Sequence, residues 1–72
     1  MTIIRDVQTL GETIRQERKR QKVTQVELAA LAGVGVRFLR ELEGGKTSCQ
    51  LGQTFSLLET LGISITATSR AQ

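Results

Sequence analysis

The chain has 72 residues, enough for one domain with a modest core, and a net charge of +3, which favours an anionic partner. Five of its ten Lys and Arg residues fall within residues 15–22. Its apolar runs are far shorter than the roughly 20 residues that span a bilayer, so we expect a cytoplasmic protein. With no histidine and a single cysteine, Cys49, the sequence offers no internal disulfide, no metal-binding set and no catalytic nucleophile with its base. We therefore expect no enzyme activity, no metal and no cofactor in a single domain of residues 1–72.

The first predicted helix follows Asp6, a preferred N-cap residue, and continues to about Gln21. Its buried stripe, at helical spacing, comprises Val7, Leu10 and Ile14. The same stripe reaches Arg18 one turn later, and a guanidinium in a core-facing position requires a charged partner. The preceding residues 1–5 are apolar and β-prone, but they are too few to assign.

A second, short helix begins at a capping box, in which Thr24 is followed three residues later by Glu27, and it ends at Gly33. Its expected inner face comprises Leu28, Leu31 and Ala32. A tight link then leads to a third helix over residues 36–43, which ends at a pair of glycines. Two short helices joined by a glycine-containing turn are the signature of a helix-turn-helix motif, here residues 24–43.

The faces of the third helix indicate what it contacts. At 100° per residue its apolar side comprises Phe38, Leu39 and Leu42, and the opposite side comprises Val36, Arg37, Arg40 and Glu41. A methyl-bearing side chain and two guanidiniums suit thymine methyl groups, guanine O6 and N7, and phosphates. A merely solvated charged face is the alternative, and the third helix alone does not decide between the two.

Residues 24–43, which read TQVELAALAGVGVRFLRELE and are followed by GGKT, resemble the helix-turn-helix of the lambda-repressor-like (Cro/CI or XRE) family. The match includes Thr-Gln opening the second helix, Glu-Leu-Ala in its middle, Ala-Gly-Val at the turn and Leu-Glu-x-Gly-Lys closing the third helix. The resemblance covers about residues 10–62 and implies a domain of this family over about residues 10–64. It also implies a buried ion pair between Arg18 and Glu43, and the place of Glu43 at the edge of the inner face allows that pairing.

The resemblance implies DNA contacts outside the third helix as well. Gln25 is expected to contact a phosphate and brace the third helix, and Lys46 and Thr47 to meet the DNA backbone, although a lysine in a loop is often only solvated. Gly35 stands where the family usually has serine or threonine, so the third helix has a weaker cap and loses one side-chain contact to phosphate. The expected DNA-binding set is Gln25, Gly35, Val36, Arg37, Arg40, Glu41, Lys46 and Thr47.

The C-terminal third contains a helix and then a change of period. Apolar spacing predicts a helix over about residues 50–61, with a stripe that comprises Leu51, Phe55, Leu58 and Leu61. From residue 63 the period becomes 2, which predicts a strand over residues 63–68 with Ile63, Ile65 and Ala67 on one side. A lone strand in a helical chain has no ladder partner, so we expect these residues to pair with a second copy in a two-fold homodimer. The expected fold is thus mainly α, a compact bundle of about five short helices with one C-terminal β-strand.

With a helical XRE-like domain followed by such a strand, this chain resembles HipB-like antitoxins, in which the strands of two subunits pair. That resemblance implies a repressor of its own toxin–antitoxin operon, with double-stranded operator DNA containing an inverted repeat and a HipA-type kinase toxin as partners. A free-standing XRE-family repressor without a toxin is one alternative. A protein-interaction module that has lost DNA binding is another, but such a module is expected to lack basic residues on the third helix.

Overall fold

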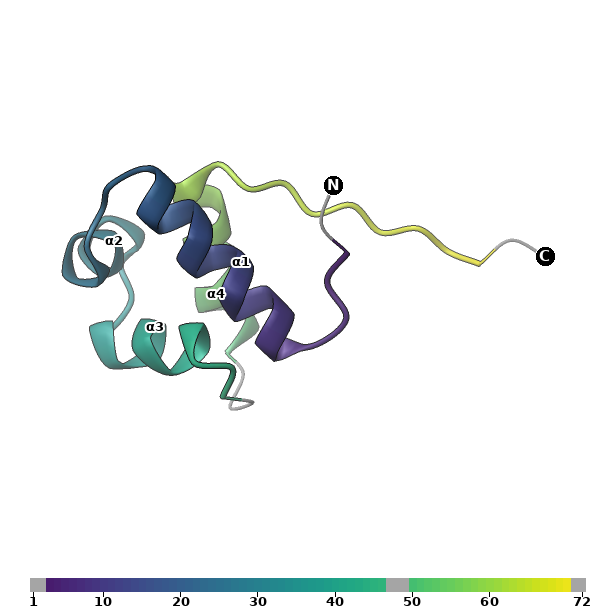
Figure 1. Ribbon diagram of the computed structural model, residues 1–72, viewed down its shortest axis with the longest axis horizontal. Coiled ribbons are helices and arrows are strands. Elements are labelled where there is room, and N and C mark those ends of the chain that lie inside the picture. Colours follow the sequence, from purple (N-terminus) through teal and green to yellow (C-terminus); the bar gives the residue numbers. More distant parts are fainter. Residues whose placement is uncertain (1–2, 47–49, 71–72) are drawn as a thin grey trace.

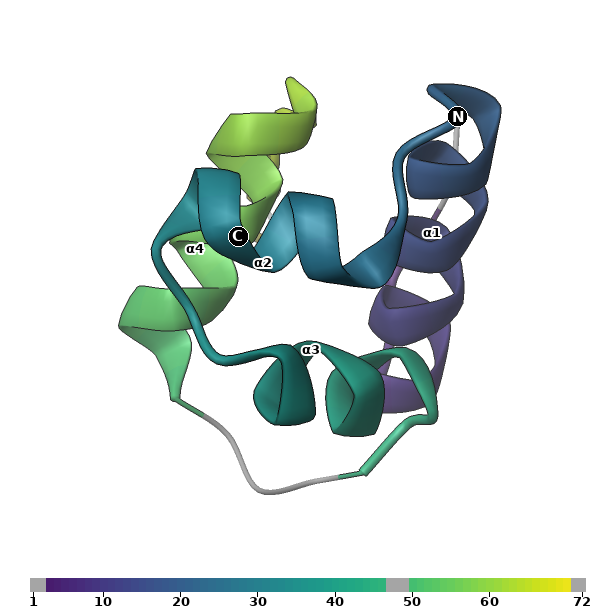
Figure 2. The same cartoon turned by 90° about the vertical axis from the view of Figure 1, so that its left-hand side faces the viewer.

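The computed structural model describes residues 3–46 and 50–70, which form four helices. They are α1 (Val7–Arg20), α2 (Gln25–Ala32), α3 (Val36–Glu43) and α4 (Leu51–Leu61). Helix α1 packs against α3 and α4, and α2 packs against the same two helices. In Figure 2, α2 and α3 accordingly lie between α1 on one side and α4 on the other. Thr47 and Cys49 lie outside the described residues.

Residues at the helix ends explain where α1 and α2 begin and where α2 stops. Hydrogen bonds from the hydroxyl and the backbone N–H of Thr9 reach Asp6 Oδ1 at the start of α1, and they lower the pKa of Asp6 below its ordinary value. The predicted capping box of α2 is confirmed, because Thr24 Oγ1 accepts from the N–H of Glu27 and Glu27 Oε1 accepts from the N–H of Thr24. Helix α2 ends at Gly33, whose φ of 74° is a left-handed conformation that glycine adopts without strain.

The core lies where the four helices meet, and each helix contributes to it. Its buried apolar residues are Ile14, Leu28, Ala29, Leu39, Leu42, Leu57, Leu58 and Leu61. Val7 and Leu10 pack against this cluster from the first half of α1, as their spacing predicts. Burying a leucine side chain contributes about 1.5–3 kcal/mol. The two buried leucines of α3 therefore anchor that helix and leave its opposite face turned outward.

A close approach of two backbones fixes how α1 crosses α3. Gly11, in the first half of α1, is buried against the carbonyl group of Leu42 and the Cα of Glu43. A methyl group on Gly11 would overlap the Leu42 carbonyl oxygen, so glycine is required for the observed spacing. Because α3 is seated on α1 at this point, the position of Gly11 helps to set the orientation of the outer face of α3.

The inner faces of α2 and α4 differ from the sequence prediction. In α2, Leu31 is 71% exposed and Ala29 is buried instead. In α4, Leu51 and Phe55 are exposed and Thr54 is buried, with its Oγ1 donating to the carbonyl oxygen one turn earlier (3.0 Å). Helix α2 carries apolar residues on nearly every side, so spacing does not select one face there. In α4 the apolar residues share one side, and the buried face is that side turned towards Thr54. Packing against the other helices determines which face is buried. Thr54 can be buried because its hydroxyl donates a hydrogen bond to the backbone of its own helix.

Two further expectations are corrected, the number of helices and the C-terminal strand. Four helices, rather than about five, are present in residues 3–46 and 50–70. Residues 63–68 form no strand within the part of the chain that the structure describes. The N–H of Ile63 still donates to the carbonyl oxygen of Leu58 (2.9 Å), but the following residues run extended away from the helices (Figure 1). A strand needs a ladder partner, and the helices of a single chain do not supply one.

The sequence predicts that no segment is long and apolar enough to span a bilayer. Across residues 3–46 and 50–70, none of the helices combines the length and the apolar character that crossing a bilayer requires.

Candidate nucleic-acid interface

Helices α2 and α3 and the turn between them form a helix-turn-helix. The turn is closed by backbone hydrogen bonds from the N–H groups of Gly33 and Val34 to carbonyl oxygens in the last turn of α2. Leu39 and Leu42 hold one face of α3 in the core. Consequently the opposite face, which carries most of the charged side chains of this helix, is presented to solvent.

Basic side chains dominate the outer face of α3 and the residues that follow it. Arg37 has 87% of its side chain exposed, and Arg40 is also exposed and makes no ion pair with the described residues. Glu41 lies between the charges of Arg37 and Lys46, with its Oε2 3.3 Å from Arg37 Nε and 3.3 Å from Lys46 Nζ. A hydrogen bond from Lys46, helped by Arg37, lowers the pKa of Glu41, so this carboxylate is ionised at neutral pH. The face can thus offer guanidinium and ammonium donors to an anionic surface.

The N-terminus of α3 adds backbone donors to this face. Gly35 is the N-cap residue, and no side chain caps the helix there. The first N–H groups of an α-helix have no partner within the helix, and they carry the positive end of its dipole. Val36, which helical spacing assigns to the outer face, instead packs partly against the core. The free N–H groups and the positive end of the dipole make this end of α3 suited to bind a phosphate oxygen.

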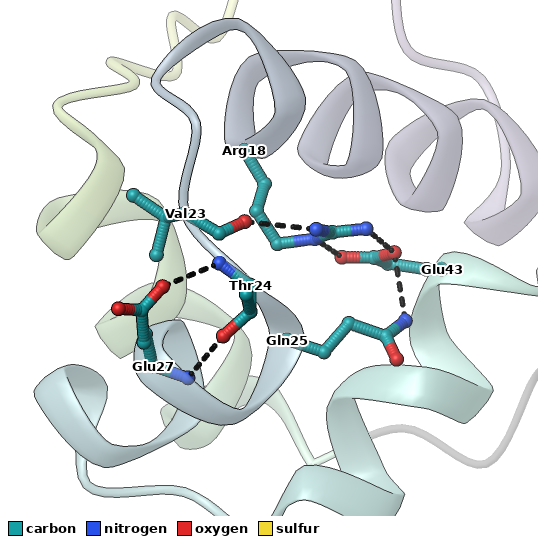
Figure 3. A network of polar contacts seen from close by, with 6 residues as sticks. All are labelled: Arg18, Val23, Thr24, Gln25, Glu27 and Glu43. Carbon is teal, nitrogen blue, oxygen red and sulfur yellow. Dashed lines mark hydrogen bonds and ion pairs between the residues drawn. The ribbon is translucent and has the colours of Figure 1, made fainter.

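A buried ion pair connects α1 with the end of α3 (Figure 3). Arg18 Nε and Nη2 donate to the two carboxylate oxygens of Glu43, at 2.7 and 3.0 Å. Arg18 Nη1 donates to the carbonyl oxygen of Val23 (2.9 Å). These side chains are only 10% and 3% exposed, and the hydrogen bonds with Glu43 raise the pKa of Arg18 above its ordinary value. The core-facing charge on α1 therefore has the bidentate partner that burial demands.

Gln25, the first residue of α2, joins the same network. Its Nε2 donates to Glu43 Oε1 (3.0 Å), so one carboxylate receives hydrogen bonds from both α1 and α2 (Figure 3). A side-chain amide nitrogen carries two hydrogens, and one of them remains for another acceptor. The arrangement fixes the start of α2 against the end of α3. It brings together Arg18, Gln25 and Glu43, three residues that the sequence singled out.

The basic stretch at residues 15–22 does not act as one unit. Arg18 lies in the buried ion pair, and Arg20 pairs with Glu17 on the same helix. Hydrogen bonds from Arg20 and Gln21 lower the pKa of Glu17 to about 2. The remaining cations, which are exposed, are Arg15, Lys19 and Lys22. The surface charge of α1 is therefore smaller than the sequence indicates.

Two residues of this region were not singled out from the sequence. Gly11 sets the approach of α1 to α3, and the signal was available, because a glycine inside a helical pattern often marks close packing. Val23 supplies the third acceptor for Arg18 through its backbone, so no side-chain pattern could have revealed it. The residues expected at a dimer contact differ from one another: Ile63 packs partly against the core, whereas Ile65 and Ala67 are exposed.

Comparison with known proteins places the chain in a class and then in a family. A family model described as a helix-turn-helix domain matches residues 9–71. An uncharacterised HTH-type transcriptional regulator, y4mF of Sinorhizobium fredii (strain NBRC 101917 / NGR234), is 48% identical over 56 residues, covering 78% of this chain and 74% of the relative. The chain therefore belongs to the helix-turn-helix family of transcriptional regulators.

Solved structures show which branch of that family the fold resembles. The HipB–O4 20mer complex matches with a TM-score of 0.86 and 22% identity, over 99% of this chain and 100% of the matched chain. The HipA–HipB–O2–O3 complex matches with a TM-score of 0.87, again at 22% identity and over 99% of this chain and 100% of the other. The chain is thus a helix-turn-helix protein with a HipB-like fold.

Proposed function

We propose that this protein is a transcriptional repressor that binds operator DNA by placing α3 in the major groove. The observation that carries the proposal is the division of α3 into two faces, with Leu39 and Leu42 buried and Arg37 and Arg40 exposed. A helix anchored in this way can enter the groove without unfolding any part of the core. A module that had lost DNA binding would have no need of two outward guanidiniums on this helix.

Each part of the interface has a role that its chemistry suits. Arg37 and Arg40 donate to guanine O6 and N7 or to phosphates, and the part of Val36 that does not pack against the core contacts a thymine methyl group. Gln25 uses its second amide hydrogen on a phosphate while Glu43 holds the first. The other backbone contacts come from Gly35, Lys46 and Thr47. Phosphate contacts position the helix, and the base contacts select the sequence.

We propose further that the protein acts as a two-fold homodimer joined through residues 63–68. These residues are extended and have no ladder partner in the described chain, so their backbone is available to a second copy. Ile65, within this segment, is 53% exposed. An antiparallel pairing would satisfy the backbone groups and cover part of this side chain. Two recognition helices about 34 Å apart would then enter successive major grooves, so the operator should be an inverted repeat.

The biological setting that best fits the fold is an autoregulated toxin–antitoxin operon in the cytoplasm. Support comes from the HipB-like fold, because the matched structures include HipB together with HipA. On this proposal the partner is a HipA-type kinase toxin. A free-standing repressor would use the same residues of α3. The reading frame next to this gene separates the two, because an antitoxin should adjoin or overlap a kinase-like gene.

The proposal is tested by selecting bound sequences from a pool of random duplexes with the full chain. We expect enrichment of an inverted repeat with half-sites about one helical turn apart, bound at two chains per duplex in sedimentation. Enrichment of single, unpaired half-sites would contradict the dimer. Recovery of no preferred sequence would contradict the repressor itself.

A further inference from the structure

Glu41 places an acidic group on the face of α3 that is proposed to bind DNA. Helix α3 contains two carboxylates, Glu41 and Glu43, and Glu43 is buried in its ion pair with Arg18. Glu41 remains 28% exposed beside Arg37 and Lys46. A carboxylate is repelled by phosphates, so its presence here requires an explanation that general affinity for DNA does not provide.

The contacts of Glu41 hold two of the cations that a DNA backbone would otherwise attract. Its Oε2 lies 3.3 Å from both Arg37 Nε and Lys46 Nζ. Arg37 precedes Glu41 by four residues, the less favourable order for such a pair on a helix, and its side chain is 87% exposed. On a duplex, Arg37 and Lys46 can exchange this contact for phosphates, but the exchange leaves the carboxylate without its partners in front of the duplex. The resulting repulsion opposes the exchange, so Glu41 retains the two cations unless the DNA offers it another donor.

The groups that a duplex offers to an unpartnered carboxylate are few. In the major groove these are the exocyclic amino groups of bases, above all N4 of cytosine. Where such an amino group stands opposite Glu41, its hydrogen bond offsets the repulsion from the phosphates. Where it is missing, Glu41 either retains Arg37 and Lys46 or faces the groove without a donor, and binding is weaker in both cases.

We propose that Glu41 is a specificity-determining residue that weakens binding to DNA lacking a suitably placed base amino group. The inference rests on the proposed DNA-binding function and adds to it a means of rejecting other sequences. Rejecting other sequences requires a group that weakens binding to them, and the Glu41 carboxylate does so by repelling DNA that offers it no amino group. Arg37 and Lys46 then contribute fully to binding only on the operator.

The test compares Glu41→Gln with Glu59→Gln, which removes the same charge from an exposed position on α4. The probes are a random-sequence duplex of about 30 base pairs and the duplex that the wild-type protein enriches from a random pool. Glu41→Gln should bind the random duplex about tenfold more tightly, and its salt dependence should steepen by about 1 to 2, because Arg37 and Lys46 are released. Its affinity for the enriched duplex should change by less than about threefold, so discrimination falls. Glu59→Gln should change both affinities by less than about twofold.

A second measurement examines the link between Glu41 and Arg37 directly. Arg37→Gln should weaken random-duplex binding little in the wild-type background and about fivefold in the Glu41→Gln background, since only there is Arg37 released. Circular dichroism checks that each variant is folded. Equal losses in the two backgrounds, or an unchanged ratio of affinities in Glu41→Gln, would overturn the role of Glu41 while leaving the repressor proposal intact. If the wild-type protein enriches no sequence, the proposed function fails and the inference fails with it.

Discussion

Replacing Arg18 by methionine tests the buried connection between α1 and α3. The change removes all three hydrogen bonds that the guanidinium makes, two to Glu43 and one to the carbonyl of Val23. Glu43, whose side chain is 3% exposed, would keep only its hydrogen bond from Gln25. A buried carboxylate without its countercharge costs about 3–5 kcal/mol. We therefore expect Arg18→Met to be among the most destabilising single changes in the chain.

The size of this effect is large for a protein of 72 residues. A domain of this length has a free energy of unfolding of about 4–11 kcal/mol, so the change removes a large share of it. With about 4–8 °C lost per kcal/mol, the melting temperature should fall by about 12–40 °C. Thermal and urea denaturation followed by circular dichroism measure the loss. All variants must be compared at one protein concentration, because a dimer gains stability with concentration.

A double variant separates the lost countercharge from lost packing. Arg18→Met combined with Glu43→Leu leaves no buried charge, and replacing both members of such a pair by apolar residues is often close to neutral. We expect the double variant to regain most of the stability lost in the single one. An unchanged melting temperature in Arg18→Met would refute the reasoning. A double variant as unstable as the single one would show that shape, rather than charge, accounts for the loss.

Packing, charge and the terminal segment can each be tested separately. Gly11→Ala should cost about 1–3 kcal/mol in thermal denaturation because its methyl group meets the α3 backbone, whereas Gly52→Ala, with open space around it, should be neutral or stabilising; equal effects would contradict the close packing. The pKa of Glu17 is about 2 in the folded protein and 4.5 ordinarily, so its contribution to stability is present above pH 4.5 and lost as the pH falls towards 2. Melting temperatures across this range should therefore decline less steeply in Glu17→Gln, and parallel profiles would argue against that contribution. Deleting residues 63–72, or Ile65→Lys, should yield monomers in sedimentation and weaken operator binding about 100-fold, and a tight dimer after either change would exclude this interface.

The first three helices could be predicted from the sequence because their ends carry explicit local signals. Asp6 caps α1, Thr24 and Glu27 form the capping box of α2, and Gly33 takes the left-handed conformation that ends it. Each signal depends on residues within one turn, so no knowledge of the tertiary structure was needed. The predicted range of the third helix, 36–43, likewise matches the structure.

The buried faces of α2 and α4 could not be predicted in the same way. Leu31 and Phe55 are large and apolar, yet both are exposed, while Ala29 and Thr54 are buried. Helical spacing identifies a face only when polar residues mark the opposite side, which α2 largely lacks, and in α4 it does not say which part of the apolar side is buried. The arrangement of the neighbouring helices decides the outcome, and that information is spread over the whole chain.

The candidate site could be predicted in part. Arg18 drew attention because a charge fell on a core-facing position, and the family resemblance supplied Glu43 as its partner. The outward arginines of α3 followed from helical geometry. The contacts of Glu41 with Arg37 and Lys46 were not anticipated, because the loop that carries Lys46 has no periodicity from which its position could be deduced.

The central claim is that the outer face of α3 reads DNA, and Arg40→Ala tests it most directly. Arg40 is exposed and has no ion-pair partner among the described residues, so its removal should leave the fold unchanged. Gel-shift titrations compare the variant with the wild-type protein on the enriched duplex and on a random duplex. If Arg40 reads a base, the loss on the enriched duplex should be about 1–3 kcal/mol, or roughly 5- to 150-fold, with a much smaller loss on the random duplex. Wild-type affinity for the enriched duplex, in this variant and in Arg37→Ala, would contradict the assignment of α3 as the recognition helix.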